Sequence, residues 1–219
     1  LDIIGKKADE EYKIEALLYG AAGMLDDGDD DYVERLRLFY KSASATFDIK
    51  RMNGTEWRYS KMRPPSFPTI RISQISQLLF RRLRMFTHII DCCDIEDIKK
   101  MFDVEVSDYW LTHYKFGKES KARNKEIGTE MQNALIINAV APVVFSYGVQ
   151  TNDNRKKEWA IEILETVPAE INNITKSWAE LGIDVRDASE SQALIELRKN
   201  YCDKSNCLRC PICHKIMKY

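Results

Sequence analysis

The sequence predicts an all-α fold, a single domain of about eight to ten helices that ends in a short cysteine-rich tail. Two observations predict this class. Glycine and proline are scarce, with 9 and 6 among 219 residues, whereas sandwiches and barrels need many tight turns. Apolar residues also recur at the spacing of an amphipathic helix in most segments. The predicted domain spans residues 1–219, and the tail covers 202–219.

The first two helices are predicted at 8–25 and 32–47, on either side of the acidic turn 26–31. The last aspartates of this turn stand where a side chain caps the second helix and favours its N-terminal dipole. Residues 48–68 are predicted to form a loop, because Asn53-Gly54 favours a turn and Pro64, Pro65 and Pro68 exclude a helix interior.

The helix predicted at 69–90 has the clearest pattern. Its apolar stripe consists of Ile72, Ile75, Leu79, Leu83, Phe86 and Ile90. Its polar stripe consists of Arg71, Gln74, Gln77, Arg81, Arg84 and His88. We therefore expect the apolar stripe in the core and the polar stripe against solvent or a ligand.

Further helices are predicted at 95–102, 107–114, 128–147, 157–166, 174–181 and 188–201. Pro142 is expected to kink or break the apolar helix at 128–147. Asp187 and Glu190 resemble a capping box for the last helix. The polar connection at 150–156 is the weakest point of the predicted single domain.

Composition narrows the class of protein. The net charge is −1, so no global field attracts the chain to a polyanion or a membrane. No segment of the sequence approaches the roughly 20 consecutive apolar residues that a helix needs to span a bilayer, so no membrane partner is expected. Six cysteines without an export signal predict reduced thiols and a cytoplasmic location. Because it begins at Leu1 without a methionine, the chain is expected to be a piece of a longer protein.

A basic stretch covers residues 50–84. It contains nine cations against one glutamate, for a net charge of +8, with aromatic residues interleaved. Arginine binds phosphate oxygens in pairs, and aromatic rings stack on unpaired bases. The candidate nucleic-acid-binding residues, for DNA or RNA, are Arg58, Arg63, Arg71, Arg81 and Arg84. In the alternative interpretation these arginines pair with acids such as Asp26 to Asp31, and the aromatic residues are core.

The tail is a candidate metal centre. Cys202, Cys207, Cys210 and Cys213 lie within twelve residues, and two Cys-x-x-Cys steps can present thiolates to one zinc ion or to an iron–sulfur cluster. Ordinary zinc sites separate two such steps by a longer loop. The alternative is a set of reduced, unliganded cysteines.

No catalytic constellation is recognisable. The sequence has no P-loop, GxGxxG, HExxH or Gly-x-Ser-x-Gly motif, so no catalytic residue is proposed. His113 has no nucleophile motif beside it and is interpreted as a hydrogen-bonded structural residue. Whether the chain is an enzyme stays open.

Several strings together resemble a known family. They include "IEALLYGAAGML" from Ile14, "RPPSFPTIRISQIS" from Arg63, "YWLTHYKFG" from Tyr109, "NALIINAVAPVVFSYG" from Asn133 and "CLRCPI" from Cys207. In this order they resemble the C-terminal half of the bacterial, Bacteroidetes-type family labelled domain of unknown function 2851. The resemblance implies a missing N-terminal half with a nuclease-like fold. The tail of the family that it resembles has glycine at the position of Cys213. A site with four cysteines would therefore be specific to this chain and not shared by the family.

Two functions from different classes follow. The first is a helical accessory domain that binds nucleic acid and is attached to a nuclease-like N-terminal half. The second is a structural or protein-interaction domain with no ligand of its own.

Overall fold

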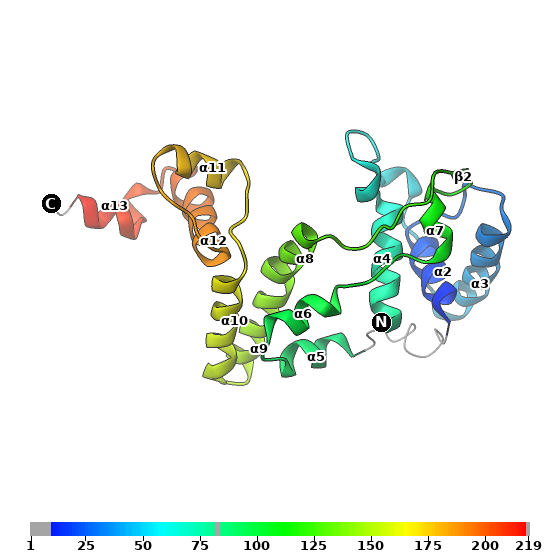
Figure 1. Cartoon of the computed structure of the whole chain (residues 1–219), viewed down its shortest axis with the longest axis horizontal. Coiled ribbons are helices and arrows are strands. Elements are labelled where there is room, and N and C mark those ends of the chain that lie inside the picture. Colours follow the sequence, from blue (N-terminus) through cyan, green and yellow to red (C-terminus); the bar gives the residue numbers. More distant parts are fainter. Residues whose placement is uncertain (1–9, 82–83, 218–219) are drawn as a thin grey trace. The chain divides into compact units, whose positions relative to one another are not determined.

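The computed structural model describes residues 10–81 and 84–217 (Figure 1). Helices form nearly all of the regular structure in these ranges, and the two strands, β1 (His113–Lys115) and β2 (Lys118–Glu119), make one short hairpin. The predicted all-α class is confirmed, as is a cysteine-containing C-terminal tail.

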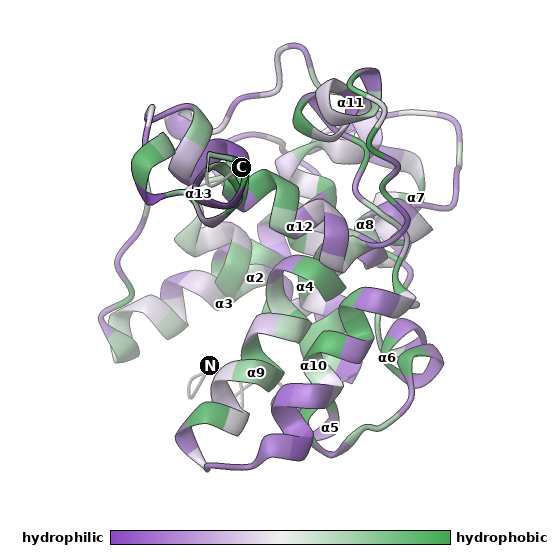
Figure 2. Ribbon diagram, turned by 90° about the vertical axis from the view of Figure 1, so that its left-hand side faces the viewer, coloured by the Kyte–Doolittle hydropathy of each residue, from purple (hydrophilic) through white to green (hydrophobic). Residues whose placement is uncertain are grey.

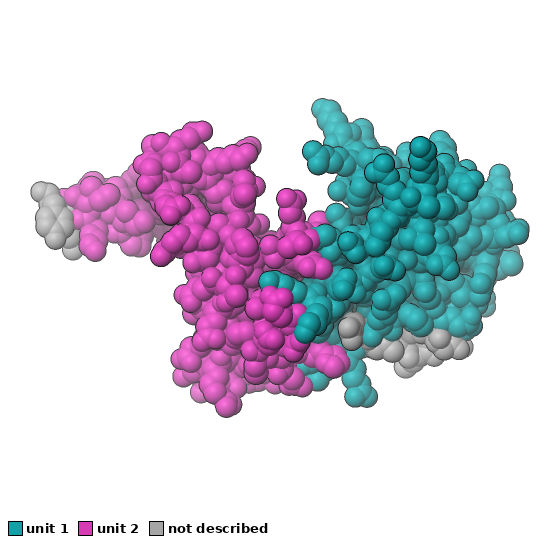
Figure 3. Space-filling view, in the orientation of Figure 1, with its two compact units in different colours: residues 1–87, 99–128 teal, residues 88–98, 129–219 magenta. Residues whose placement is uncertain are grey.

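The chain divides into two compact units, which are described separately (Figure 3). Unit 1 comprises residues 1–87 and 99–128, and unit 2 comprises residues 88–98 and 129–219. The sequence predicted one domain with its weakest point at 150–156. In the structure those residues lie inside unit 2, where they connect two packed helices, and the chain passes between the units elsewhere, at 87–99 and 128–129.

Unit 1 is built on three helices, α2 (Glu11–Ala21), α3 (Asp31–Phe47) and α4 (Pro68–Arg81), with the short helix α7 (Asp108–Thr112) and the hairpin. Two single turns, η1 (Gly54–Glu56) and η2 (Pro64–Ser66), interrupt the predicted loop 48–68. Helix α2 packs against both α3 and α4. The core of unit 1 includes Tyr19 and Trp110, whose rings lie 5.3 Å apart. As predicted, an aspartate of the acidic turn caps α3: Asp30 accepts a hydrogen bond from the Val33 amide at 2.9 Å.

The buried face of α4 corrects the sequence prediction. Ile72 is buried, but Ile75 is 47% exposed and Phe86 is 57% exposed, while Gln74 and Gln77 of the expected polar stripe are 3% and 2% exposed. Part of the reason is that α4 ends at Arg81 and a separate helix, α5 (Met85–Asp91), follows, so the stripe was never one continuous face. Leu79 is half-buried, and Leu83 lies outside the described residues.

Hydrogen-bond partners explain why Ser73, Gln74 and Ser76 are buried on this face of α4. Gln74 donates to the backbone carbonyls of Lys125 and Glu126 at 2.9 and 3.2 Å, which satisfies a loop that crosses the helix. Ser73 and Ser76 donate to a buried carboxylate described below. Such partners offset the cost of burying polar groups, but Nε2 of the buried Gln77 has none among the described residues.

The bounds of α5 and of α6 (Ile95–Met101) straddle the division between the units. Unit 2 then contains α8 (Thr129–Leu135), α9 (Ala141–Gln150), α10 (Asn154–Thr166), α11 (Asn173–Glu180), α12 (Ala188–Leu197) and α13 (Pro211–Ile216). Helices α9 and α10 pack closely together, and Figure 2 shows the contrast between the apolar α9 and the hydrophilic start of α10. A β-carbon on Gly148 would lie 2.9 Å from the Asp153 carbonyl oxygen, so glycine permits this contact.

A π-helical turn, Ile136–Val140, joins α8 to α9, and a second one, Arg198–Cys202, follows α12. The predicted disturbance at Pro142 is therefore a π turn immediately before the proline. The run Thr129–Gln150 is 22 residues long and is, by length and composition, the one described helix that could cross a membrane. Buried helices of water-soluble proteins meet the same criterion, so this finding assigns no membrane location.

Two helices of unit 2, α11 and α12, are capped at their N-termini by side chains from neighbouring residues in the sequence. Asn172 accepts from the amides of Ile174 and Thr175, and Thr175 accepts from the Asn172 amide, which completes a capping box on α11. The predicted box on α12 is half made. Asp187 accepts from the Glu190 amide at 2.9 Å, but the Glu190 carboxylate accepts from the amide of Arg186 instead of that of Asp187.

Candidate functional site

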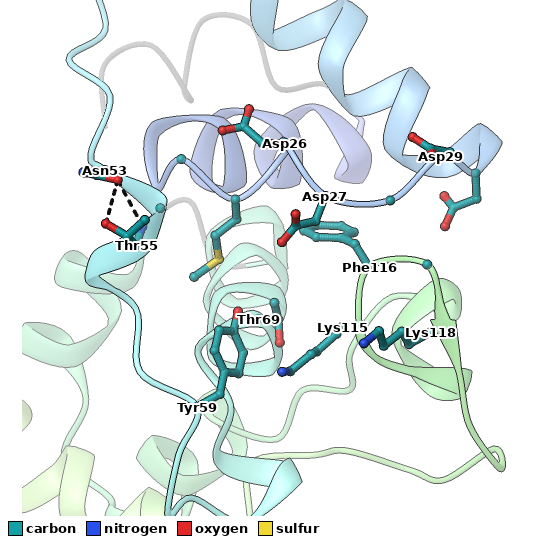
Figure 4. A pocket seen from close by; sticks show the side chains of 16 residues that line it. Asp26, Asp27, Asp29, Asn53, Thr55, Tyr59, Thr69, Lys115, Phe116 and Lys118 are labelled. Atoms are coloured by element: carbon teal, nitrogen blue, oxygen red, sulfur yellow. Dashed lines mark hydrogen bonds between the residues drawn. The ribbon is translucent and has the colours of Figure 1, made fainter.

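A cleft of unit 1 has a volume of about 940 Å³ and opens between three loops (Figure 4). The first loop follows α2, the second contains η1, and the third is the β1–β2 hairpin. Charged lining residues of opposite sign come from different loops. Asp26, Asp27, Asp29 and Asp30 lie on the first loop, and Lys115 and Lys118 lie on the hairpin.

Glycines allow the backbones of these loops to approach one another closely. A β-carbon on Gly54 would lie 2.3 Å from the Gly23 carbonyl oxygen, and one on Gly23 would lie 2.3 Å from that of Met52. On the other side of the cleft, a β-carbon on Gly117 would lie 3.3 Å from the α-carbon of Gly28. Close backbone approach of this kind requires glycine. Hydrogen bonds from the Met52 amide to the Ala21 carbonyl and from Trp57 Nε1 to the Ala22 carbonyl, both at 2.7 Å, join the loop that contains η1 to the end of α2.

Two aspartates of the acidic loop have structural roles. Asp26 forms an ion pair with Arg51. Asp30 caps α3 and also accepts a hydrogen bond from the Tyr109 hydroxyl at 2.7 Å. The other two lining aspartates, Asp27 and Asp29, have no hydrogen bond or ion pair with any described side chain, so their carboxylates are available to a ligand.

The basic wall is carried by the hairpin. The ammonium group of Lys115 lies 4.4 Å from the centre of the Tyr59 ring and 5.5 Å from that of Phe67, so both rings attract the cation. Burial raises the pKa of Tyr59, and the negative charge of Asp27 raises it further, which indicates that Asp27 faces Tyr59 across the cleft. Within the described ranges, neither Lys115 nor Lys118 forms an ion pair, so both charges are free for an anion.

Four of the five arginines predicted to bind nucleic acid are exposed: Arg58, Arg63, Arg81 and Arg84. None of the four has an acidic partner among the described residues. The fifth, Arg71, is half-buried and donates to the Gln74 side chain at 2.7 Å, and burial lowers its pKa. None of the five therefore pairs with Asp26 to Asp31, and in the described part of the basic stretch such a pair is formed by Arg51, with Asp26.

The structure does not gather the five arginines at one place. Arg58 and Arg63 belong to the loop before α4, whose Tyr59 and Phe67 rings pack 5.0 Å apart beside the cleft. Arg81 ends α4, about 20 Å further along at 1.5 Å per residue. The loop that carries Arg58 and Arg63 contacts the hairpin through Phe67, which packs against Tyr114, and through Tyr59, which lies beside Lys115.

A second polar site lies inside the core of unit 1. Glu15 of α2 is 1% exposed and has no cationic partner in the described chain. Its carboxyl group receives hydrogen bonds from Ser73 at 2.9 Å, from Ser107 at 2.9 and 3.1 Å, and from Tyr32. Burial raises the pKa of Glu15 to about 7, although these hydrogen bonds act in the opposite direction. This carboxyl is a titratable group near neutral pH, but it does not line the cleft.

An aromatic stack leads from this site toward the cleft. Tyr32 stacks on Tyr109 with ring centres 4.0 Å apart, and Tyr109 stacks on His113 at 3.9 Å. The Tyr109 hydroxyl also accepts from the Gly117 amide at 3.0 Å. His113 itself contacts the Tyr109 carbonyl at 2.9 Å, as expected for a structural histidine. Sequence analysis missed Glu15, although an acid between apolar residues on a core-facing helix was the available signal.

The cysteine tail is arranged around two short helical turns. Cys207 begins the turn Cys207–Arg209, and Cys210 precedes α13 and is buried. Burial raises the pKa of the Cys213 thiol, and the nearby Cys207 and Cys210 raise it further. Within residues 10–81 and 84–217, no three histidine, cysteine or acidic side chains are grouped so that they could hold a metal ion. The zinc or iron–sulfur site at these cysteines stays a prediction.

Comparison with known proteins gives one match. The model of a family described as a protein of unknown function (DUF2851) matches residues 1–173, a range that contains all of unit 1 and leaves the cysteine tail outside. Comparison with curated proteins gave no match, and neither did comparison with solved structures. Because the match covers most of the sequence, the chain belongs to the DUF2851 family of proteins of unknown function.

Proposed function

We propose that the chain is a helical accessory domain that binds nucleic acid through the basic residues of unit 1 beside the cleft. The observation that carries this proposal is the set of unpaired cations on two adjoining loops. Arg58 and Arg63 come from the loop before α4, and Lys115 and Lys118 come from the hairpin that packs against it. The attachment of this domain to a nuclease-like N-terminal half stays a prediction of the family resemblance.

Free cations in one region of a nearly neutral protein call for a physical reason. Elsewhere in the described chain some exposed arginines, such as Arg186 and Arg198, pair with nearby acids. Beside the cleft Arg51 pairs with Asp26, whereas the four proposed binding cations have no ion pair with a described residue. Clustered cations without partners repel one another, and that cost is offset when phosphates neutralise them.

The proposal predicts a salt-dependent affinity. Each phosphate contact that is lost should flatten the slope of log affinity against log salt by about 0.7 to 0.9. We expect the double variant Arg58→Ala/Arg63→Ala to weaken binding of a fluorescent 20-nucleotide strand and to flatten this slope by about two such steps. Fluorescence anisotropy titrations over a range of salt concentrations measure both quantities.

Two further double variants locate the site. Arg81→Ala/Arg84→Ala removes the same charge from the far end of α4, and it should have less effect if the cleft side binds the strand. Arg155→Ala/Arg198→Ala removes two positive charges from unit 2 and is the matched control. If the cleft-side variant and this control change affinity equally, the proposal fails, and the structural or protein-interaction domain becomes the better interpretation.

A further inference from the structure

We infer that the cleft selects single-stranded over double-stranded nucleic acid, because its two walls carry opposite charge. This inference rests on the proposed function and adds the class of nucleic acid that the site takes. The basic wall is Lys115 and Lys118 of the hairpin, and the acidic wall is Asp27 and Asp29 of the loop after α2 (Figure 4). None of the four charged groups forms an ion pair with a described residue, although the Lys115 ammonium group also lies over the Tyr59 and Phe67 rings.

A duplex presents phosphates to every wall of a groove that encloses it. Double-stranded DNA carries one negative charge per about 1.7 Å of its length, distributed over both strands. In this cleft such a ligand would gain contacts with the lysines but would place phosphates against two unpaired carboxylates. Like-charge contact of this kind disfavours the duplex relative to a ligand that avoids it.

A single strand can satisfy both walls. Its phosphates run along one side, and its unpaired bases and sugars project from the other. The phosphates can lie on Lys115 and Lys118, while amino groups of the bases donate hydrogen bonds to Asp27 and Asp29. Carboxylates accept from base amino groups in this way, and only unpaired bases leave all of these donors free.

The dimensions of the cleft favour the same ligand. A volume of 940 Å³ corresponds to a cube roughly 10 Å on an edge, less than the about 12 Å width of the DNA major groove alone. Hydrogen bonds oppose widening of the cleft: the Met52 amide donates to the Ala21 carbonyl at 2.7 Å, and the Tyr109 hydroxyl links Asp30 to the Gly117 amide. A few nucleotides of one strand fit this space, and a duplex does not.

The test compares one 20-nucleotide DNA strand with its fully paired duplex, using the intact chain at one salt concentration. We expect the single strand to bind at least about tenfold more tightly, the equivalent of 1.4 kcal/mol. Lys115→Gln/Lys118→Gln should weaken single-strand binding while keeping the long side chains beside Tyr59. A thermal melt of this variant checks that unit 1 stays folded.

The acidic wall provides the sharper test. Asp27→Asn/Asp29→Asn keeps hydrogen-bonding oxygens but removes both negative charges, so duplex affinity should rise more than single-strand affinity and the preference should shrink. The matched control is Asp91→Asn/Asp184→Asn, which removes two exposed carboxylates from unit 2. An equal rise for both ligands would show a general charge effect and overturn the inference.

The failures of the two proposals are distinguishable. Equal affinity for strand and duplex in the unaltered chain would overturn the single-strand inference and leave nucleic-acid binding standing. Absence of measurable binding to either ligand at low salt would remove both.

Discussion

Glu15 is a buried carboxyl group without a cationic partner among the described residues. Its acceptor oxygens are satisfied by hydroxyl groups of Tyr32, Ser73 and Ser107, which come from three other segments. Hydroxyl groups can either donate to a carboxylate or accept from a carboxylic acid, so this shell accommodates both protonation states. Burial favours the neutral one and places the pKa at about 7.

The raised pKa predicts an unusual pH dependence of stability. Between pH 4.5 and 7 the folded state keeps the Glu15 proton that the unfolded chain has lost, so the free energy of unfolding should fall as the pH rises through this window. The shift of about 2.5 pH units corresponds to roughly 3 kcal/mol, complete above pH 7. Urea unfolding at a series of pH values measures it.

Substitution isolates this contribution. Glu15→Gln has no titratable group at this position and should remove the fall between pH 4.5 and 7, whereas Glu180→Gln on the exposed surface of α11 should preserve it. A fall that persists in Glu15→Gln would assign the effect to other groups.

Substitution of Gly23 tests whether the backbones of the cleft loops are in close contact. It has a φ of +70°, and a β-carbon there would meet the Met52 carbonyl oxygen at 2.3 Å. Gly182 has a φ of +80° but open space around it, so it shares the backbone conformation without the contact. Gly182→Ala should cost about 1 kcal/mol of stability, and Gly23→Ala clearly more. Equal costs in denaturant unfolding would mean that the loops are not in close contact.

At the scale of the element, α4 shows what a periodic pattern can and cannot predict. The helix was predictable from its apolar spacing, and so was its start among the prolines. Its buried face was not, because the partners of Ser73, Ser76 and Gln74 lie 58, 61 and 51 residues away in sequence. Caps at Asp30 and Asn172 were within reach of sequence analysis, since each bonds residues two or three positions along the chain.

A pair of isoleucines tests the corrected face of α4. Ile72→Ala should cost about 2–5 kcal/mol of stability, because the side chain is buried in the core beside Trp110. Ile75→Ala removes the same atoms from a side chain that is 47% exposed, so it should cost much less. The measurement is urea unfolding of both variants. A larger loss at Ile75 would restore the face expected from the sequence.

The tail is an element whose chemistry only a direct measurement decides. If Cys202, Cys207, Cys210 and Cys213 hold a metal ion, protein prepared without chelator should contain about one equivalent of zinc, or a coloured cluster. Elemental analysis and an absorption spectrum measure this. Four freely titrating thiols in the folded protein would contradict the metal hypothesis.

At the scale of the whole molecule, the chain divides into two compact units, and we expect them to respond separately to damage. Ile72→Ala in unit 1 should reduce amide hydrogen-exchange protection in α2, α3 and α4 and leave α9, α10 and α12 unchanged. Ile163, fully buried in α10, provides the reciprocal variant Ile163→Ala. Loss of protection throughout the chain in both variants would show one cooperative domain, as the sequence predicted.

The division into units was beyond sequence analysis for a physical reason. No linker rich in glycine, serine or proline separates them, and unit 1 takes up the chain again at residue 99 after residues 88–98 have joined unit 2. The cleft was equally hidden, because its walls come from loops about 90 residues apart. The acidic turn, the basic stretch and the Asn53-Gly54 turn were each visible in the sequence, but only the fold shows that they meet.

The π-helical turn at Ile136–Val140 has a consequence for how the gene can vary in length. A π turn contains one residue more than an α-helical turn needs, so it absorbs an insertion without changing the rotational phase of the helices on either side. Loss of one codon within this turn would restore an ordinary α-helix and keep Val144 and Gly148 directed at α10. Loss of one codon within α9 would rotate every later residue of that helix by about 100° and turn this contact toward solvent.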